Sequence, residues 1–265
     1  MRITSDVLDQ TINRNKEIKQ EIERMVHYIN TRYKEVNILS PEKQALQILK
    51  EHHLIQLPIK DEDWGGAIRR LPNGNKVFVI NTAQPRIYQY FIYWHEIYHL
   101  IADFEENYSH LIATELNFSE RKADYFASQM LLGSGVYDYY YKLGNSLYFT
   151  KKIMHCIDIF KAPYKAILIQ LYESACERND EDLKAEIKAN FDIKLKQHEL
   201  ESLFKELSLD VSLVQPSNII DLGELKSRVE EKHQLNEEVE MYREHQEFIE
   251  EFIIALEEAV DGLGI

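Results

Sequence analysis

The sequence contains little cysteine, no long apolar run and no surplus of positive charge. Its two cysteines, Cys156 and Cys176, lie outside any CxxC pattern. A disulfide framework is therefore not expected, and a reducing, cytoplasmic compartment is the prediction. No segment approaches the ~18 apolar residues of a membrane span, and the first residues lack the apolar core of a signal peptide. We expect no membrane partner.

The negative charge of the chain is unevenly distributed. Residues 180–265 contain 23 acidic and 9 basic side chains, whereas residues 1–179 contain 22 of each sign. This break predicts two regions, a folded domain over 1–179 and an acidic helical region over 180–265. Neither region has the excess of Lys and Arg that contacts with phosphates require, so direct nucleic-acid binding is not expected.

Hydrophobic periodicity predicts that most of the chain is helical. A helix over 41–52 would have Ser40 as its N-cap and Pro41 at its first position. The other expected helices cover 5–35, 86–103, a segment beginning at Ser119, one or two segments within 147–177, and a tail interrupted at 215–218 and near Gly223.

One hairpin is expected within this helical chain. Residues 64–70 and 76–81 are rich in β-branched and aromatic residues, and Asn73-Gly74 between them is a strong hairpin signal. The predicted class is therefore α+β, mostly α, with one small antiparallel sheet and a helical C-terminal extension.

The sequence His95-Glu96-Ile97-Tyr98-His99 is an HExxH motif within a predicted helix. Residues four apart lie on the same helix face, so both imidazoles can reach one ion about 2 Å away. Glu96 can accept a proton from water that a zinc ion has acidified. The alternative is a pair of unrelated histidines on an ordinary helix.

A third ligand and an open coordination position are needed for catalytic zinc. Glu120 follows the motif by 21 residues and begins an ExxxD pattern that ends at Asp124. It lies one turn before an apolar helix face, so we expect Glu120 to be the third ligand. Asp124 can accept the remaining N–H of a zinc-bound histidine. Alternatively, Glu120 is a solvated charge near a helix N-terminus.

These motifs resemble the ImmA/IrrE family of zinc metallopeptidases, a gluzincin-like group of bacteria, phages and mobile elements. The similarity extends from Trp64 to Glu173 and includes the hairpin, HExxH and Glu120-x-x-Ala123-Asp124. It implies a zincin-like core over 1–179, with Zn²⁺ bound by His95, His99 and Glu120, and Glu96 as general base.

The resemblance also implies a partner and shows two departures. Family members often cleave or relieve a separately encoded helix-turn-helix repressor, which makes such a protein the expected substrate. The usual Gly before the second histidine is Tyr98, which would narrow the cleft or bring a hydroxyl to the metal. The usual Met-Pro after the leucine pair is Gly133-Ser134.

Several alternatives stay open at this point. An oxyanion donor could be Tyr98, His155 or one of the tyrosines at 137 and 139–141, although such residues are more often core. The strand over 76–81 could pair with an extended peptide or be purely structural. The acidic tail could pack on the core or dock a partner.

The leading functional prediction is a zinc endopeptidase acting on a regulatory protein. The alternative is a non-proteolytic, metal-stabilised interaction protein of a mobile element or a toxin-antitoxin-like system. Other divalent metals also accept a His/His/Glu set. The oligomeric state cannot be deduced from the sequence.

Overall fold

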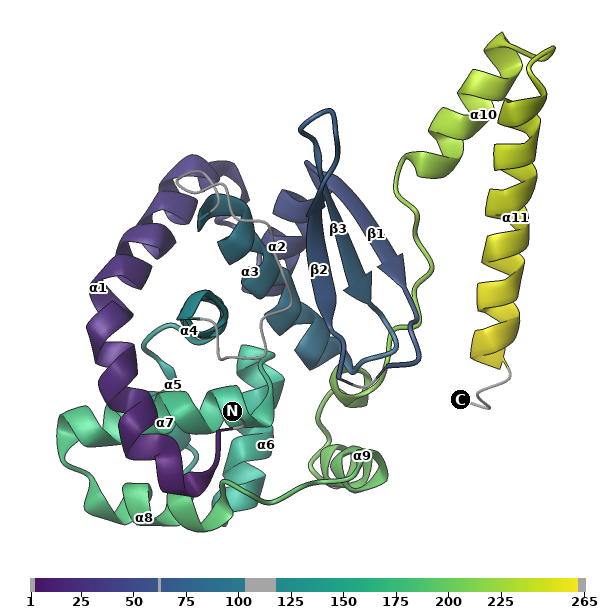
Figure 1. Ribbon diagram of the computed structural model, residues 1–265. Coiled ribbons are helices and arrows are strands. Elements are labelled where there is room, and N and C mark those ends of the chain that lie inside the picture. Colours follow the sequence, from purple (N-terminus) through teal and green to yellow (C-terminus); the bar gives the residue numbers. More distant parts are fainter. Residues whose placement is uncertain (1–2, 62, 103–117, 262–265) are drawn as a thin grey trace.

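The computed structural model describes residues 3–61, 63–102 and 118–261 (Figure 1). These residues form eleven α-helices and one sheet of three strands, which confirms the predicted α+β class with mostly helix. The helices are α1 Leu8–Arg32, α2 Pro41–Lys50, α3 Arg86–Ala102, α4 Phe118–Leu132, α5 Val136–Lys142, α6 Phe149–Phe160, α7 Tyr164–Arg178, α8 Glu181–Asn190, α9 Gln197–Glu206, α10 Leu225–Leu235 and α11 Glu240–Asp261.

The predicted hairpin is confirmed. Strands β2 (Gly66–Arg70) and β3 (Lys76–Asn81) pair antiparallel. Gly74 in the turn has a φ of 84°, a left-handed conformation that glycine adopts without a Cβ clash. Its amide donates to the carbonyl oxygen of Leu71 at 2.9 Å, which closes the turn.

A third strand makes the sheet mixed, whereas the sequence predicted a purely antiparallel one. Strand β1 (His53–Leu57) pairs parallel to β3, so the strand order is β1-β3-β2. One inward position of β1 holds the polar residue Gln56, which hides the apolar alternation of a strand. The Gln56 side chain can be buried at low cost because its amide donates a hydrogen bond to the hydroxyl of Tyr93 at 3.1 Å.

The sheet lies beside α2 and α3, and α4 packs on another side of α3 next to α1 (Figure 1). Helix α1 buries one face, with apolar residues at helical spacing. Trp94 of α3 and Phe126 of α4 are fully buried, and their rings meet edge to face with centroids 6.1 Å apart. This aromatic contact fixes the two helices that carry the HExxH and ExxxD motifs.

Three local features differ from, or add to, the predictions. Ser40 stands at the N-cap of α2, but its hydroxyl donates to Glu42 at 2.5 Å and no side-chain cap bond forms. Helix α5 was not predicted. Helix α4 ends at Leu132, and the next residue, Gly133, has a φ of 53°, the left-handed conformation that commonly terminates helices. Most of the segment between the helix expected over 86–103 and the helix expected from Ser119, for which we predict a loop, lies outside the described residues.

The core continues beyond residue 179, the limit of the predicted first domain. Helix α8 packs on α7, while α9 and the short 3₁₀ segment Val211–Val214 pack on α6 and α3. The side chains of Phe191 and Phe204 are fully buried in the same core. The assignment of two domains at 179/180 stays a prediction.

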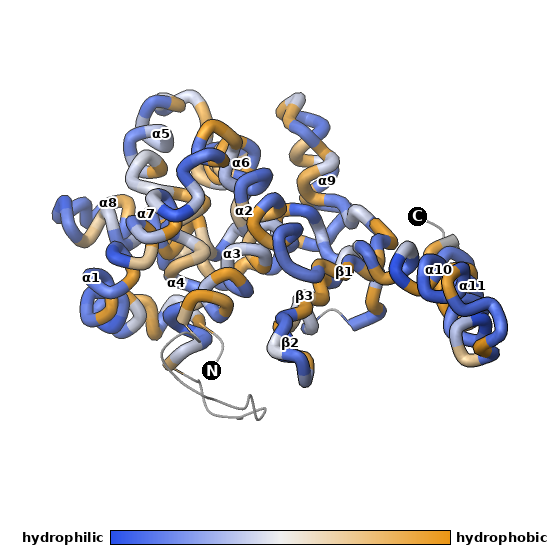
Figure 2. The backbone as a smooth tube through the Cα atoms, turned by 90° about the horizontal axis from the view of Figure 1, so that it is seen from above, coloured by the Kyte–Doolittle hydropathy of each residue, from blue (hydrophilic) through white to orange (hydrophobic). Residues whose placement is uncertain are grey.

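The chain after this core crosses the sheet and then forms a helical hairpin. Gln56 and Asp221 exchange two backbone hydrogen bonds of 2.7 and 2.9 Å, which attach the segment before α10 to β1. Helices α10 and α11 then pair with each other at one end of the molecule (Figures 1 and 2). Among the described helices, none combines the length and apolar character needed to cross a membrane.

Candidate metal centre

Helix α3 presents both histidines of the HExxH motif on one side. The rings of His95 and His99 lie with centroids 4.9 Å apart, and their Nε2 atoms face each other at 3.2 Å. The His95 side chain is 17% exposed and that of His99 is 6% exposed, so the pair lies at the edge of the core. Two neutral imidazole nitrogens at this spacing can bind the same ion.

Glu120, in the first turn of α4, completes the cluster. Its Oε2 lies 3.1 Å from His95 Nε2, and its Oε1 lies 3.3 Å from His99 Nε2. The Glu120 side chain is 49% exposed, so the group opens toward solvent at this carboxylate. When one ligand atom is taken from each of the three residues, these atoms all lie within 4.8 Å of one another. The group could therefore hold a metal ion.

The spacing of these atoms suits a small divalent cation. Bonds of about 2.0–2.1 Å at tetrahedral angles place ligand atoms roughly 3.3 Å apart. The separation of 3.2 Å between the two histidine Nε2 atoms lies close to that value, and each of them is also approached by a different oxygen of the Glu120 carboxylate, at 3.1 and 3.3 Å. Three protein ligands leave one tetrahedral position open, as catalytic sites require.

Asp124, one turn after Glu120 on α4, fixes the orientation of the His95 ring. Its Oδ1 lies 3.0 Å from His95 Nδ1, on the side of the ring away from the other ligands. A hydrogen on Nδ1 bonded to this carboxylate leaves Nε2 as the nitrogen that can bind metal. The structure therefore places Asp124 where the sequence predicted a supporting residue.

The carboxylates also set the charge of the site without metal. Burial alone would lower the pKa of His95, but the hydrogen bonds that its protonated ring donates to Asp124 and Glu120 outweigh burial and raise this pKa to about 10. Hydrogen bonds from His95 and His99 in turn hold the pKa of Glu120 far below its ordinary value. A metal ion would replace the proton on Nε2 of His95 while the Asp124 contact persists.

Glu96 follows His95 directly in the sequence of α3 and is buried, with 5% of its surface exposed. A carboxylate is costly to bury without interactions, and this one contributes to raising the pKa of His95. A carboxylate next to the ligand histidines in the sequence is the residue type that can accept a proton from metal-bound water. The role of general base stays a prediction.

The two proposed oxyanion donors have different surroundings. Tyr98 is 3% exposed and its ring packs on His99 and Phe126, with centroids 5.5 and 5.9 Å away. Burial raises the pKa of its hydroxyl well above the ordinary value. His155 lies on α6, which packs on α5, α7 and α9. In the described residues His155 makes no hydrogen bond or ring contact with the cluster.

The residue after Glu120 anchors α4 and was missed by the sequence reasoning. One nitrogen of Arg121 donates to the carbonyl oxygen of Thr11 at 2.5 Å and to Asn15 Oδ1 at 3.0 Å, both on α1. The Arg121 guanidinium therefore ties the ligand-bearing turn of α4 to a long helix. The one hint in the sequence is Asn15, a polar residue among the apolar positions that form the buried face of α1. That Asn15 pairs with Arg121 could be seen only in the tertiary structure.

Strand β2, rather than β3, offers a sheet edge near this site. The sequence raised β3 as a strand that could pair with a peptide, but β3 lies between β1 and β2 and has both edges occupied. A Cβ added at Gly65 or Gly66 would come within 2.5 or 2.8 Å of Ile92, one turn before His95. These glycines allow the start of β2 to approach α3 closely, and the other edge of β2 pairs with no described strand.

Comparisons with known proteins found no match: no family model fits this chain, and neither the curated proteins nor the solved structures include a significantly similar one. The function must therefore be argued from the site itself.

Proposed function

We propose that this protein is a zinc-dependent endopeptidase whose metal is bound by His95, His99 and Glu120. The observation that carries the proposal is the convergence of these ligand atoms within 4.8 Å of one another, with the buried Glu96 next to His95 in the chain. The resemblance of the HExxH and ExxxD motifs to ImmA/IrrE metallopeptidases supports the same reading.

Each residue of the centre has a distinct task in this proposal. When bound, the zinc ion supplies a Lewis acid that acidifies water and polarises a peptide carbonyl. Glu96 accepts a proton from the attacking water and passes it to the leaving amine. Asp124 holds the His95 ring in the ligating tautomer through Nδ1.

One edge of β2 pairs with no strand among the described residues, and an extended substrate could pair there. A peptide added there would form backbone hydrogen bonds with Gly66–Arg70, and the close approach at Ile92 brings the start of this strand next to α3. The proposed substrate is a regulatory protein, with a separately encoded helix-turn-helix repressor as the candidate from the family resemblance. Cleavage would take place in a segment that can become extended.

Metal content is the test of the ligand set. Elemental analysis of the purified protein should give about one zinc per chain, since the ligands define a single site. Glu120→Ala should lose the metal, whereas Glu96→Gln should keep it because Glu96 is not a ligand. No zinc in the unchanged protein after refilling under reducing conditions would contradict the proposal.

The same variants separate proteolysis from a purely structural metal. A non-proteolytic interaction protein is the second candidate, and the exposed acidic hairpin α10–α11 is the observation that favours it. Loss of a general base typically costs about 10²–10⁴-fold in rate. If the unchanged protein cleaves a candidate repressor and the Glu96→Gln variant retains its metal but does not cleave, the peptidase is supported. If the unchanged protein and the Glu96→Gln variant cleave equally, the peptidase is excluded.

A further inference from the structure

The α10–α11 hairpin leaves large hydrophobic side chains on its surface. Helix α10 has no buried residue, and on α11 Ile249 is the apolar side chain that is buried among those described. Met241, Phe248 and Phe252 of α11 are 48, 66 and 37% exposed. The two phenylalanine rings stack in parallel, with centroids 6.2 Å apart and planes at 7°.

These exposed residues form one stripe along α11. The stripe consists of Met241, Phe248, Phe252, Ala255 and Ala259, which recur at intervals of three, four and seven residues and so lie on one side of the helix.

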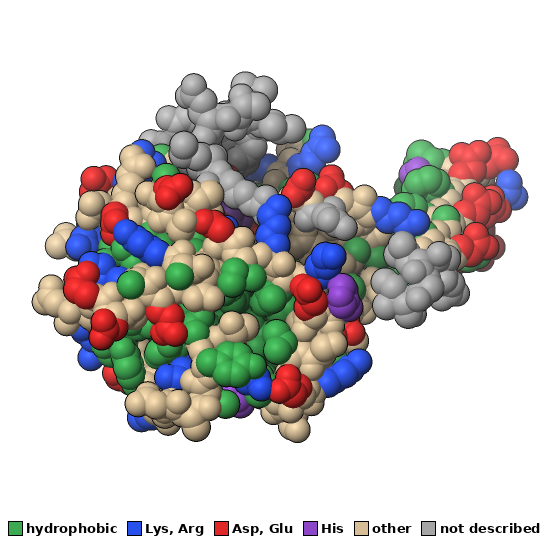
Figure 3. Space-filling view, turned by 90° about the horizontal axis from the view of Figure 1, so that it is seen from below, with side chains coloured by type: hydrophobic (Ala, Val, Ile, Leu, Met, Phe, Trp, Pro, Cys, Tyr) green, Lys and Arg blue, Asp and Glu red, His purple; other side chains and the backbone are tan. Residues whose placement is uncertain are grey.

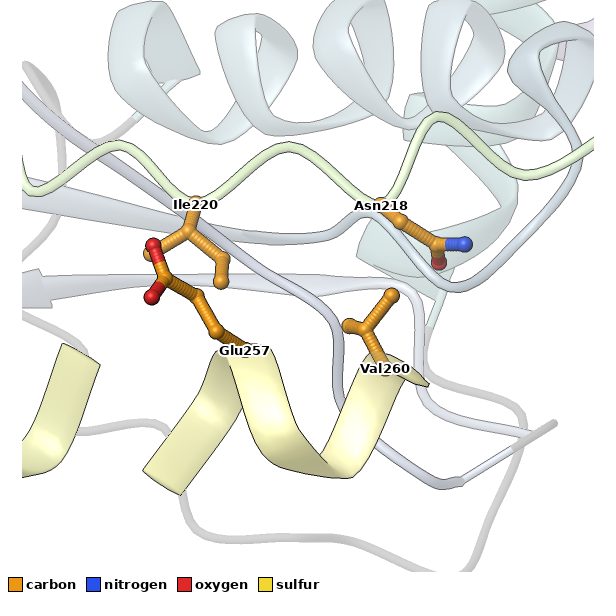
Figure 4. A pocket seen from close by; sticks show the side chains of 4 residues that line it. All are labelled: Asn218, Ile220, Glu257 and Val260. Carbon is orange, nitrogen blue, oxygen red and sulfur yellow. The ribbon is translucent and has the colours of Figure 1, made fainter. Parts of the chain in front are cut away.

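A different side of α11 faces the rest of the molecule. Helix α11 packs on α10, and its buried Ile249 lies away from the stripe by helical spacing. Near the end of the helix, Glu257 and Val260 point toward Asn218 and Ile220 of the extended segment, across a pocket of about 450 Å³ (Figure 4). The stripe is therefore not the surface of α11 that faces the extended segment. It is an apolar face that meets solvent along the helix.

One border of the stripe is mostly acidic, with Ile254 as its one apolar member. A ridge of glutamates follows the stripe at the same helical spacing: Glu240, Glu244, Glu247, Glu251 and Glu258. Residues 224–261 as a whole contain 13 acidic and 4 basic side chains, and so hold most of the net charge of −14. Figure 3 shows red acidic side chains along the outer end of this projecting arm, next to green hydrophobic ones.

We infer that this stripe and its acidic ridge bind a positively charged amphipathic helix of a partner protein. Apolar residues of such a helix would cover Phe248 and Phe252, and Lys or Arg beside them would pair with the ridge. A second copy of this chain does not fit, because two ridges of the same sign would repel. The inference does not rest on the metal centre and holds whether or not the chain cleaves peptides.

A designed peptide tests the surface directly on the full-length protein. The probe is a labelled helical peptide of about 20 residues, enough to span α11, with Leu along one face and Lys bordering it. Fluorescence polarisation should show saturable binding that weakens with added salt, because the charge contacts are exposed. A peptide with Glu in place of every Lys should not bind.

Matched variants of α11 locate the contact. Phe248→Ser with Phe252→Ser, and separately Glu244→Lys with Glu251→Lys, should each weaken binding by about 10-fold or more, as loss of a central contact does. The controls are Glu250→Lys and Glu257→Lys, singly and as a pair, which change exposed residues of α11 away from the stripe and its ridge. These should bind within about twofold of the unchanged protein, since they do not touch the partner.

Three results would overturn the inference. They are no binding of the Lys peptide, equal binding by the stripe variants and the controls, or concentration-dependent dimers in sedimentation that the Phe248→Ser, Phe252→Ser protein no longer forms. Circular dichroism of each variant checks that α11 remains helical. Normal metal content in the stripe variants separates this surface from the proposed peptidase site.

Discussion

The two helical pairs α3–α4 and α10–α11 use their aromatic residues in opposite ways. In α3–α4, Trp94 and Phe126 have no exposed surface and hold the motif helices together. In α11, Phe248 and Phe252 stack on each other in solvent. Buried aromatics contribute to stability, whereas exposed ones at regular spacing indicate a surface that another molecule covers. The first pair positions a site, and the second offers a surface.

The largest expected effect separates these two uses of phenylalanine. Phe126→Ala should lower the free energy of unfolding by about 3–5 kcal/mol, because it leaves a cavity in a packed core. Phe248→Ala should change it by less than about 0.5 kcal/mol, because its side chain is already exposed. Urea denaturation of both variants measures the difference. A large loss of stability in Phe248→Ala would show that α11 is covered by protein in solution.

The next effect compares a carboxylate that supports the metal centre with one that does not. Asp124→Asn should weaken metal affinity by about 10–100-fold, the typical cost of losing a partner of a ligating histidine. Glu250→Gln on α11 is the matched control and should leave affinity unchanged. Competition with a chromogenic chelator gives both values. An unchanged affinity in Asp124→Asn would mean that the His95 ring is oriented by packing alone.

The smallest effect concerns burial of a carboxylate away from the site. Glu173 of α7 is 2% exposed and accepts a hydrogen bond of 2.9 Å from the Tyr125 hydroxyl of α4. Burial raises the pKa of Glu173 above its ordinary value, so the folded state binds the proton more readily than the unfolded state. Lowering the pH through that folded pKa toward about 4.3 therefore stabilises the unchanged protein.

Glu173→Gln removes this titration and keeps an acceptor for Tyr125. We expect the variant to be more stable than the unchanged protein near neutral pH, and the gap to shrink as the pH falls. Urea midpoints at several pH values measure the gap, with Glu251→Gln on exposed α11 as the control that should show no such trend. A gap that is constant with pH would contradict a raised pKa for Glu173.

Local patterns in the sequence were sufficient for much of the fold. The hairpin followed from Asn73-Gly74 between β-rich runs, and the spacing of His95 and His99 placed both on one helix face. Strand β1 was missed because Gln56 occupies an inward position, where its amide bonds to Tyr93. Helix α5 was missed as well, and its seven residues span only two helical turns, too short for a clear period.

The candidate site divides in the same way. The sequence by itself determined the chemical inventory, two histidines and a glutamate on one helix and an ExxxD pattern on the next, because these spacings are properties of a single helix. Only the tertiary structure decided that Glu120 reaches both histidines and that Arg121 ties its helix to α1. It also decided that β3 lies between β1 and β2, while one edge of β2 pairs with no described strand. Contacts between distant segments depend on how the core packs, and packing is a cooperative property of the whole chain that no local pattern encodes.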